Sequence, residues 1–327
     1  MKQWQRIIAV CAASIGLGLL VSATPVLAAD AAKDVVLTGD AKCTRCHDEA
    51  DGPQLLAIGK TRHGVRADSR TPSCTSCHGE SEKHLGHKGS EKPPKPDRTF
   101  GKNSATSAED RSGACMTCHK NDPKRQHWTG SQHAGQDVAC SSCHQIHTAQ
   151  DKVRGKTTQA EVCFTCHKEQ RAQLTRMSRH PIAEGKVACS DCHNAHGSTG
   201  PKLLVKSTVN GTCYTCHAEK RGPLLWEHAP VQDDCSICHL PHGSAYAPML
   251  KARPPFLCQE CHVNEHASSL RMSGNTMTNG AVTTNLGQRP AGDVAAGISA
   301  FATGRACLNC HIQVHGSNHP AGAKFNR

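Results

Sequence analysis

Residues 189–197 read Cys-Ser-Asp-Cys-His-Asn-Ala-His-Gly, and the pattern of the first five, Cys-x-x-Cys-His, occurs ten times in the chain. The ten copies begin at Cys43, Cys74, Cys115, Cys140, Cys163, Cys189, Cys213, Cys235, Cys258 and Cys307. They use every cysteine except Cys11. At this composition, chance would place only about 0.1 such motif in the chain. The motif therefore decides how this chain is built.

The spacing of the motif suits covalent attachment of haem. Two thiols three residues apart can add to the two vinyl groups of one porphyrin, and the adjacent histidine then reaches the iron as its proximal ligand. Zinc sites or disulfides would leave the histidine after every cysteine pair unexplained. The sequence predicts ten covalently bound haem c groups, attached through Cys43, Cys46, Cys74, Cys77, Cys115, Cys118, Cys140, Cys143, Cys163, Cys166, Cys189, Cys192, Cys213, Cys216, Cys235, Cys238, Cys258, Cys261, Cys307 and Cys310. The predicted proximal ligands are His47, His78, His119, His144, His167, His193, His217, His239, His262 and His311.

The remaining histidines reveal an internal repeat. Each repeat unit holds one motif, a free histidine, a second motif and another free histidine; units one to five span residues 43–84, 115–147, 163–196, 213–242 and 258–315. Ten free histidines match ten haems, which predicts a second, distal histidine on every iron: His63, His84, His133, His147, His180, His196, His228, His242, His266 and His315. The sequence leaves open which distal histidine serves which haem, and also the choices of His84 over His87 and of His315 over His319. His127 is surplus too, and no methionine recurs at a fixed place in the repeat.

The composition favours a core made of cofactor rather than of side chains. Aromatic residues form 3% of the 327 residues, while there are 21 Cys and 23 His. A chain with so few large apolar residues cannot bury enough apolar surface to offset its conformational entropy. We expect a mostly irregular fold with short α-helices wrapped around ten haems and little or no β-structure. Short helices are expected around the motifs, for example over 158–176 and 210–221.

The first 28 residues have the pattern of a secretory signal peptide. Lys2 and Arg6 precede an apolar stretch from Ile7 to Val21, and Ala28 ends a candidate cleavage site. A retained membrane anchor is the alternative. We expect an N-terminal haem-binding half over residues 29–160, with haems one to four and the approach to haem five. A C-terminal half over 161–327 would carry haems five to ten. Two stretches interrupt the repeat: a Lys/Pro/Ser-rich linker at 88–110, and a loop at 273–304 that is either a partner contact or simply solvated.

The formal charge of +11 does not indicate nucleic acid as a partner. Cleavage of the first 28 residues removes Lys2 and Arg6. Each ferric haem then adds two propionates and one positive iron, about −1 in total. The mature holoprotein would therefore be nearly neutral when oxidised, and no nucleic-acid partner is expected.

Two histidines on each iron predict electron transfer rather than catalysis. A six-coordinate iron has no open position for a substrate atom, and bis-histidine ligation keeps the reduction potential below that of a His/Met haem. With one haem for roughly every thirty residues, neighbouring porphyrins are expected to form a conducting chain. We predict an electron-transfer protein and not an enzyme; a haem enzyme would need one high-spin iron.

Longer stretches add a family resemblance. They are the sequence of residues 189–197, the stretch TCYTCHAEKRGPLLWEHAPV from Thr212 and CLNCHIQVHGSNHP from Cys307. With these stretches the chain resembles the periplasmic decahaem cytochromes of outer-membrane porin–cytochrome conduits, the MtrA, MtoA, PioA and DmsE group. The resemblance covers nearly the whole mature chain and implies an elongated fold of two pentahaem halves with bis-histidine ligation.

The resemblance also implies a location and partners. It implies a periplasmic protein held at the outer membrane inside a β-barrel porin. It further implies exchange with periplasmic or inner-membrane multihaem cytochromes, and with an outer-surface cytochrome or extracellular iron. The direction of electron flow stays open, because relatives serve iron oxidation, metal or mineral reduction and sulfoxide respiration. The alternative function is a soluble periplasmic carrier that supplies a terminal reductase such as a sulfoxide reductase.

Overall fold

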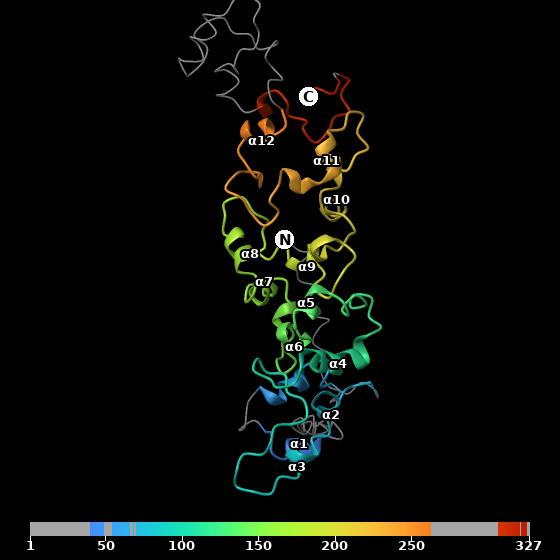
Figure 1. The fold of residues 1–327 in the computed structure, drawn as a ribbon, viewed down its shortest axis with the longest axis vertical. Coiled ribbons are helices and arrows are strands. Elements are labelled where there is room, and N and C mark those ends of the chain that lie inside the picture. Colours follow the sequence, from blue (N-terminus) through green and yellow to red (C-terminus); the bar gives the residue numbers. More distant parts are fainter. Residues whose placement is uncertain are drawn as a thin grey trace, which may run out of the picture.

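The computed structural model describes residues 40–48, 54–65, 68, 70–262, 307–320 and 322–325. The expected signal peptide, His266 and the 273–304 loop lie outside these residues. The chain forms an elongated body along which the helices run from the N-terminal part of the chain at one end to the C-terminal part at the other, with neighbouring helices side by side (Figure 1). Helices α1 to α3 lie at one end, and α12 lies near the C-terminal residues at the other (Figure 1).

Short helices joined by irregular segments make up this body. The α-helices are α1 (Ala41–Thr44), α2 (Cys74–His78), α3 (Glu82–Leu85), α4 (Ala108–His119), α5 (Gln132–Gly135), α6 (Cys140–Cys143), α7 (Gln159–Cys163), α8 (Lys168–Gln173), α9 (Cys189–Cys192), α10 (Val209–Cys213), α11 (Ala229–Asp233) and α12 (Phe256–Gln259). The 3₁₀ helices are η1 (Leu55–Lys60), η2 (Lys152–Arg154), η3 (Pro201–Leu203), η4 (Ala218–Lys220), η5 (Cys235–Ile237) and η6 (Cys307–Asn309).

The residues before the motifs explain where several helices begin. The side chain of Ser73 accepts a hydrogen bond from the backbone N–H of Ser76 at the start of α2. Ser107 does the same at α4, and Thr208 at α10. These caps satisfy N–H groups that a helix end leaves unpaired. Most motifs need only one helical turn, so the helices remain short.

The helices expected within 158–176 and 210–221 are each divided into two pieces. Helix α7 ends at Cys163 and α8 begins at Lys168, while α10 ends at Cys213 and η4 begins at Ala218. The break falls inside the motif in both cases. The local reason is that the motif histidines adopt non-helical backbone angles, with φ −82° and ψ 67° at His167 and φ −101° and ψ 49° at His217.

Over the described residues the chain has isolated β-bridges but no strand, which confirms the predicted fold class. Two of the bridges, His193 with Leu204 and His239 with Leu250, occupy equivalent places in units three and four. The segment after the second motif therefore folds back beside the motif histidine in both units.

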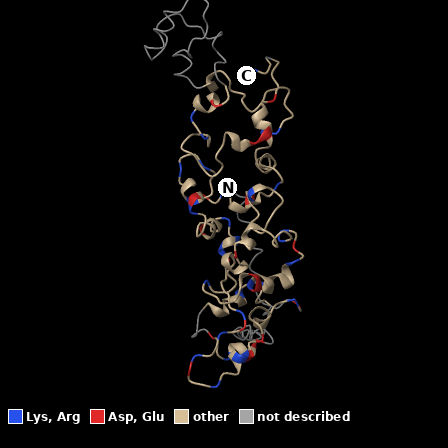
Figure 2. Cartoon of the chain, viewed as in Figure 1, with Lys and Arg blue, Asp and Glu red and all other residues tan. Residues whose placement is uncertain are grey.

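The described residues form almost no apolar core of their own. In the described part of the chain, the buried apolar side chains are those of Ala114, Trp128, Ala139, Ala188 and Leu250. Five such side chains cannot offset the ordering entropy of a chain this long. Charged side chains of both signs are scattered along the whole body rather than gathered at one place (Figure 2). Within the described ranges, none of the helices combines the length and the apolar character that a membrane span requires.

Candidate haem-binding axis

Nine motif histidines each face one free histidine. The ring centres of each pair lie 5.9 to 6.4 Å apart. The pairs are His47 with His84, His78 with His147, His119 with His63, His144 with His196, His167 with His133, His193 with His242, His217 with His180, His239 with His315 and His262 with His228. Each free histidine in these pairs is one of the ten that the repeat singled out.

The spacing of the pairs suits two ligands on opposite sides of one metal. A metal–imidazole bond of about 2.0–2.1 Å, with the ring centre about 1.1 Å behind the nitrogen, puts two such ring centres about 6.2 Å apart. Rings that stack on each other would lie closer than this. Nine pairs inside so narrow a range, each joining a motif histidine to a free one, fit ligation better than ring packing.

The pairing links neighbouring repeat units. The free histidine between the motifs of one unit faces the first motif of the next unit, as His63 of unit one faces His119 of unit two. The free histidine after the second motif faces the second motif of the preceding unit, as His147 of unit two faces His78 of unit one. His84 has no preceding unit to face and pairs with His47 of its own unit. Each unit is therefore completed by its neighbours.

Hydrogen bonds hold the rings with one nitrogen available. The Nδ1 of His133 lies 2.9 Å from the carbonyl oxygen of Ala195, and that of His180 lies 2.7 Å from the carbonyl oxygen of Pro241. A carbonyl can only accept, so Nδ1 carries the proton and Nε2 is left with a free lone pair. Further acceptors serve His78, His84, His144, His147, His193, His228, His239, His242 and His311. This is the arrangement that metal-bound histidines need.

Burial also favours the neutral form of several rings. Desolvation lowers the pKa of His63, His78, His119, His196, His242 and His315 below the ordinary value for histidine. An imidazole binds a metal only when it is neutral. Desolvation therefore favours the neutral, ligating form of these six rings.

The motifs follow one another in space in the order of the sequence. Within a unit the thiols of the first cysteines of the two motifs interact electrostatically, as Cys43 does with Cys74 and Cys115 does with Cys140. Between units the second cysteines interact, as Cys77 does with Cys118. The same alternation joins Cys143 to Cys166, Cys163 to Cys189, Cys192 to Cys216, Cys213 to Cys235, Cys238 to Cys261 and Cys258 to Cys307. The ten attachment points thus form a single row.

One continuous cavity of about 6190 Å³ runs along this row. Every motif histidine lines it, and so does the free histidine of every pair. Shared among ten groups, it offers about 600 Å³ each, within the usual range for a bound organic cofactor. All twenty motif cysteines are free of disulfides. The donor set and the space therefore fit haem c.

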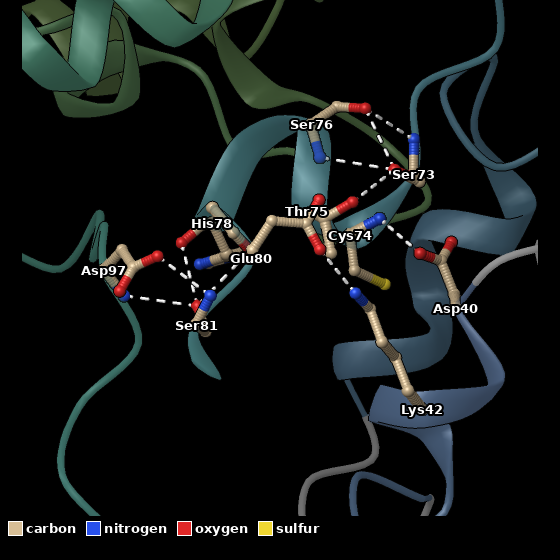
Figure 3. A network of polar contacts seen from close by, with 11 residues as sticks. Asp40, Lys42, Ser73, Cys74, Thr75, Ser76, His78, Glu80, Ser81 and Asp97 are labelled. Atoms are coloured by element: carbon tan, nitrogen blue, oxygen red, sulfur yellow. Dashed lines mark hydrogen bonds and ion pairs between the residues drawn. The ribbon is translucent and has the colours of Figure 1, made fainter. Parts of the chain in front are cut away.

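Polar side chains that the motif search missed tie the two motifs of a unit together. The carboxylate of Asp40 accepts a hydrogen bond of 2.7 Å from the backbone N–H of Cys74, which starts α2 (Figure 3). Ser112 accepts from Cys140 and Asn210 accepts from Cys235 in the same way. Each of these three residues lies three positions before the first cysteine of its unit and is buried. A polar residue at this position, three residues before the first motif of three units, was the sequence pattern by which these residues could have been found.

The expected linker at 88–110 also contributes to the site. The carbonyl of Arg98 accepts from His78, the carbonyl of Pro94 accepts from His84, and Phe100 packs edge-on against His78. Asp97 accepts a hydrogen bond from the N–H of Ser81 (Figure 3). This stretch is therefore the wall of the first two haem sites as well as a connection.

The three surplus histidines make other contacts. The Nε2 of His87 lies 3.0 Å from the carbonyl oxygen of Glu91, and the ring of His127 lies beside the side-chain amide of Gln126. The carbonyl of His319 accepts a hydrogen bond from the indole of Trp226. None of the nine histidine pairs includes them.

Comparison with known proteins agrees with this geometry. The family model for the doubled CXXCH motif matches residues 180–222 and 228–267, and that for NrfB-like cytochrome c-type proteins matches residues 74–160. The chain is 45% identical over 293 residues to the multiheme cytochrome MtrA of Shewanella baltica strain OS185, which covers 88% of this chain and 81% of that protein. The chain belongs to the MtrA family of multihaem cytochromes.

More distant relatives share part of the chain. The cytochrome c-type protein NrfB of Haemophilus influenzae is 30% identical over 156 residues, 42% of this chain and 68% of that protein. The NrfB of Escherichia coli O6:H1 is 29% identical over 139 residues, 40% of this chain and 67% of that protein. Membership in the MtrA family makes this chain a multihaem electron-transfer protein with covalently bound haem c.

Proposed function

We propose that the chain carries ten haem c groups in one row, each held between two histidines, and passes electrons along that row. The nine histidine pairs are the observation that carries this proposal. Ten motifs supply ten attachment points, and the interacting cysteines of consecutive motifs support a row without branches. Each motif would hold one haem through two thioether bonds and its histidine, with the facing histidine on the other side.

The haem supplies a one-electron Fe(III)/Fe(II) couple when it is bound. Each haem would be held by two imidazoles, one from its motif and one from the facing histidine, which would leave no position on the iron for a substrate. The hydrogen bonds at Nδ1 fix the rings, which limits the rearrangement between the two redox states. Paired histidines held in this way support electron transfer along the row of haems rather than a chemical reaction at one haem.

The tenth pair follows from the symmetry of the repeat. Unit one has no preceding unit, and its second free histidine, His84, faces its own first motif. Unit five is the last unit in this sequence, and by the same symmetry its first free histidine, His266, is expected to face its own second motif at His311. The ring of His311 is prepared in the same way as the others, with Nδ1 2.5 Å from the carbonyl oxygen of Lys324. His266 itself lies outside the described residues.

We further propose that the row crosses the outer membrane inside a β-barrel porin, with the mature protein exported to the periplasm. A hydrocarbon layer of about 30 Å insulates, and a body with charged side chains along its length cannot face lipid without a sheath. The elongated shape suits such a role (Figure 1). Multihaem cytochromes in the periplasm, and a surface cytochrome or extracellular iron outside, would be the exchange partners.

Liposomes test the conduit. The mature holoprotein would be reconstituted with an outer-membrane β-barrel porin from the same organism, around a trapped redox dye, with a membrane-impermeant reductant outside. We expect rapid reduction of the dye only when both proteins are present. If the holoprotein forms no complex with the porin, or if the dye stays oxidised with both present, the conduit is wrong and a soluble periplasmic carrier is favoured.

A further inference from the structure

The second motif of every repeat unit has a histidine whose Nδ1 meets an acceptor that follows it in the chain. In four units that acceptor is a main-chain carbonyl, from Arg98 for His78, Lys202 for His193, Pro248 for His239 and Lys324 for His311. In unit two it is a carboxylate. The Oδ2 of Asp151 lies 2.6 Å from the Nδ1 of His144.

Both oxygens of Asp151 are engaged at this site. Its Oδ1 accepts a hydrogen bond of 3.3 Å from the backbone N–H of Gln145, the residue after the motif histidine. The side chain of Asp151 is 13% exposed and that of His144 is 27% exposed. Asp151 also interacts electrostatically with the thiol of Cys143. The carboxylate is therefore fixed against the attachment site and largely shielded from water.

Other charged groups near this site do not cancel the carboxylate. Arg125 acts on His119 and His196, but it forms an ion pair with Asp122, so the two together carry no net charge. Lys152 and Arg154 follow Asp151 closely in the chain, and both side chains are exposed, where water and salt screen them.

We propose that Asp151 is a positioning residue that makes the haem of Cys140, Cys143 and His144 the hardest to reduce of the five second-motif haems. A carboxylate that accepts a hydrogen bond from Nδ1–H makes the imidazole a stronger donor to the iron. Stronger donation and a nearby negative charge both stabilise Fe(III) relative to Fe(II). A main-chain carbonyl accepts a weaker hydrogen bond from Nδ1–H than a carboxylate does, so the other four second-motif haems lack this effect. The proposal rests on the ligand pairs of the proposed function.

In the order of the motifs this haem is the fourth of ten, and its neighbours in the row are the haems of His119 and His167. The carboxylate would make the step onto this haem from either neighbour less favourable than it would be without the carboxylate.

Glu219 provides a matched control. Its Oε1 lies 3.8 Å from the Nδ1 of His217, beyond hydrogen-bonding distance, and the two side chains are 61% and 55% exposed. The carboxylate has the same charge as Asp151 and also neighbours a motif histidine. It lacks the short contact and the shielding, so its removal is expected to have little effect on the haem.

The test is a spectroelectrochemical titration of the mature holoprotein and of two variants, Asp151→Asn and Glu219→Gln. The side-chain oxygen of asparagine can still accept a hydrogen bond from Nδ1–H, so the ring stays in place while the charge is lost. We expect about a tenth of the haem absorbance to be reduced more easily in Asp151→Asn. The shift should be about tenfold in the reduced-to-oxidised ratio at fixed potential, or about 59 mV for one electron. The titration curve of Glu219→Gln should overlay that of the unchanged protein.

Two readouts separate this proposal from the proposed function. Intact mass reports whether the Asp151→Asn protein still carries ten haems; if it does and its titration overlays that of the unchanged protein, the role of Asp151 is wrong. Near-infrared magnetic circular dichroism of the unchanged, oxidised protein gives an answer even if the variant does not fold. The charge-transfer band of one haem should be displaced from the others towards that of a histidine/imidazolate pair. A single undisplaced band would overturn the inference.

Discussion

The rings of His63 and His119 belong to different repeat units, and their centres lie 6.0 Å apart with planes inclined by 68°. His133 and His167 are arranged similarly, at 6.1 Å and 85°. Other pairs have nearly parallel planes, such as His47 with His84 at 7°. The planes of His78 with His147, at 48°, and of His180 with His217, at 51°, lie between these extremes.

The ring planes predict two kinds of electron paramagnetic resonance signal in the oxidised protein. Parallel imidazole planes act on the same iron d orbital and split the levels strongly, whereas perpendicular planes leave two levels nearly degenerate. We expect rhombic low-spin signals from the near-parallel haems and a feature at large g from the haems of His119 and His167. A spectrum with rhombic signals alone would contradict these angles.

Substitution of His84 is expected to open an iron, whereas substitution of His87 is not. His84 faces His47, while His87 points its Nε2 at a carbonyl oxygen. His84→Ala should therefore convert about one tenth of the haem to the high-spin form, visible in the absorption spectrum near neutral pH. His87→Ala is the matched control and should keep every haem low-spin. The reverse result would reassign the ligand of the first haem.

Methionine at position 147 is expected to raise one reduction potential. His147 faces His78, and a His/Met iron has a higher potential than a bis-histidine iron. His147→Met should raise the potential of one haem by roughly 0.1–0.2 V, within the span of about 0.8 V that axial ligands set. His127→Met, at a surplus histidine, should leave the redox titration unchanged. A titration of His147→Met that matches the unchanged protein would show that His147 is not a ligand.

Asn210 is expected to stabilise unit four. Its side-chain amide donates to the carbonyls of Val231 and Gln232 and accepts from the N–H of Cys235, and the residue is 7% exposed. Asn210→Ala should lower the free energy of unfolding of the holoprotein by about 2–3 kcal/mol, because buried partners lose their hydrogen bonds. Guanidinium unfolding followed by circular dichroism measures the change, with Asn103→Ala at an exposed position as the control. Equal stability of the two variants would refute this role.

The features that could be predicted from the sequence are those that depend on residues close together in the chain. The spacing of two cysteines and a histidine is a local requirement of the cofactor, so the motifs and the repeat could be read directly. The short helices, the absence of strands among the described residues and the family were confirmed. The pairing of His63 with His119 could not be read, because it depends on how units one and two come together.

Long-range contacts also account for the features that sequence reasoning missed. Asp40 and Asn210 are ordinary polar residues until the next motif is placed against them. Asp151 meets its motif histidine through a carboxylate oxygen, whereas Lys202 meets its own through the main-chain carbonyl oxygen. Only the fold reveals this difference. The single helices expected within 158–176 and 210–221 were wrong as continuous helices, because the motif histidine takes a non-helical conformation.

The most direct test of the whole account is the intact mass of the mature, exported protein. We expect the mass of the chain from residue 29 onward plus ten haem groups, one for each motif. A product with clearly fewer haems would contradict the continuous row, since each missing group would leave a pair of histidines without an iron between them.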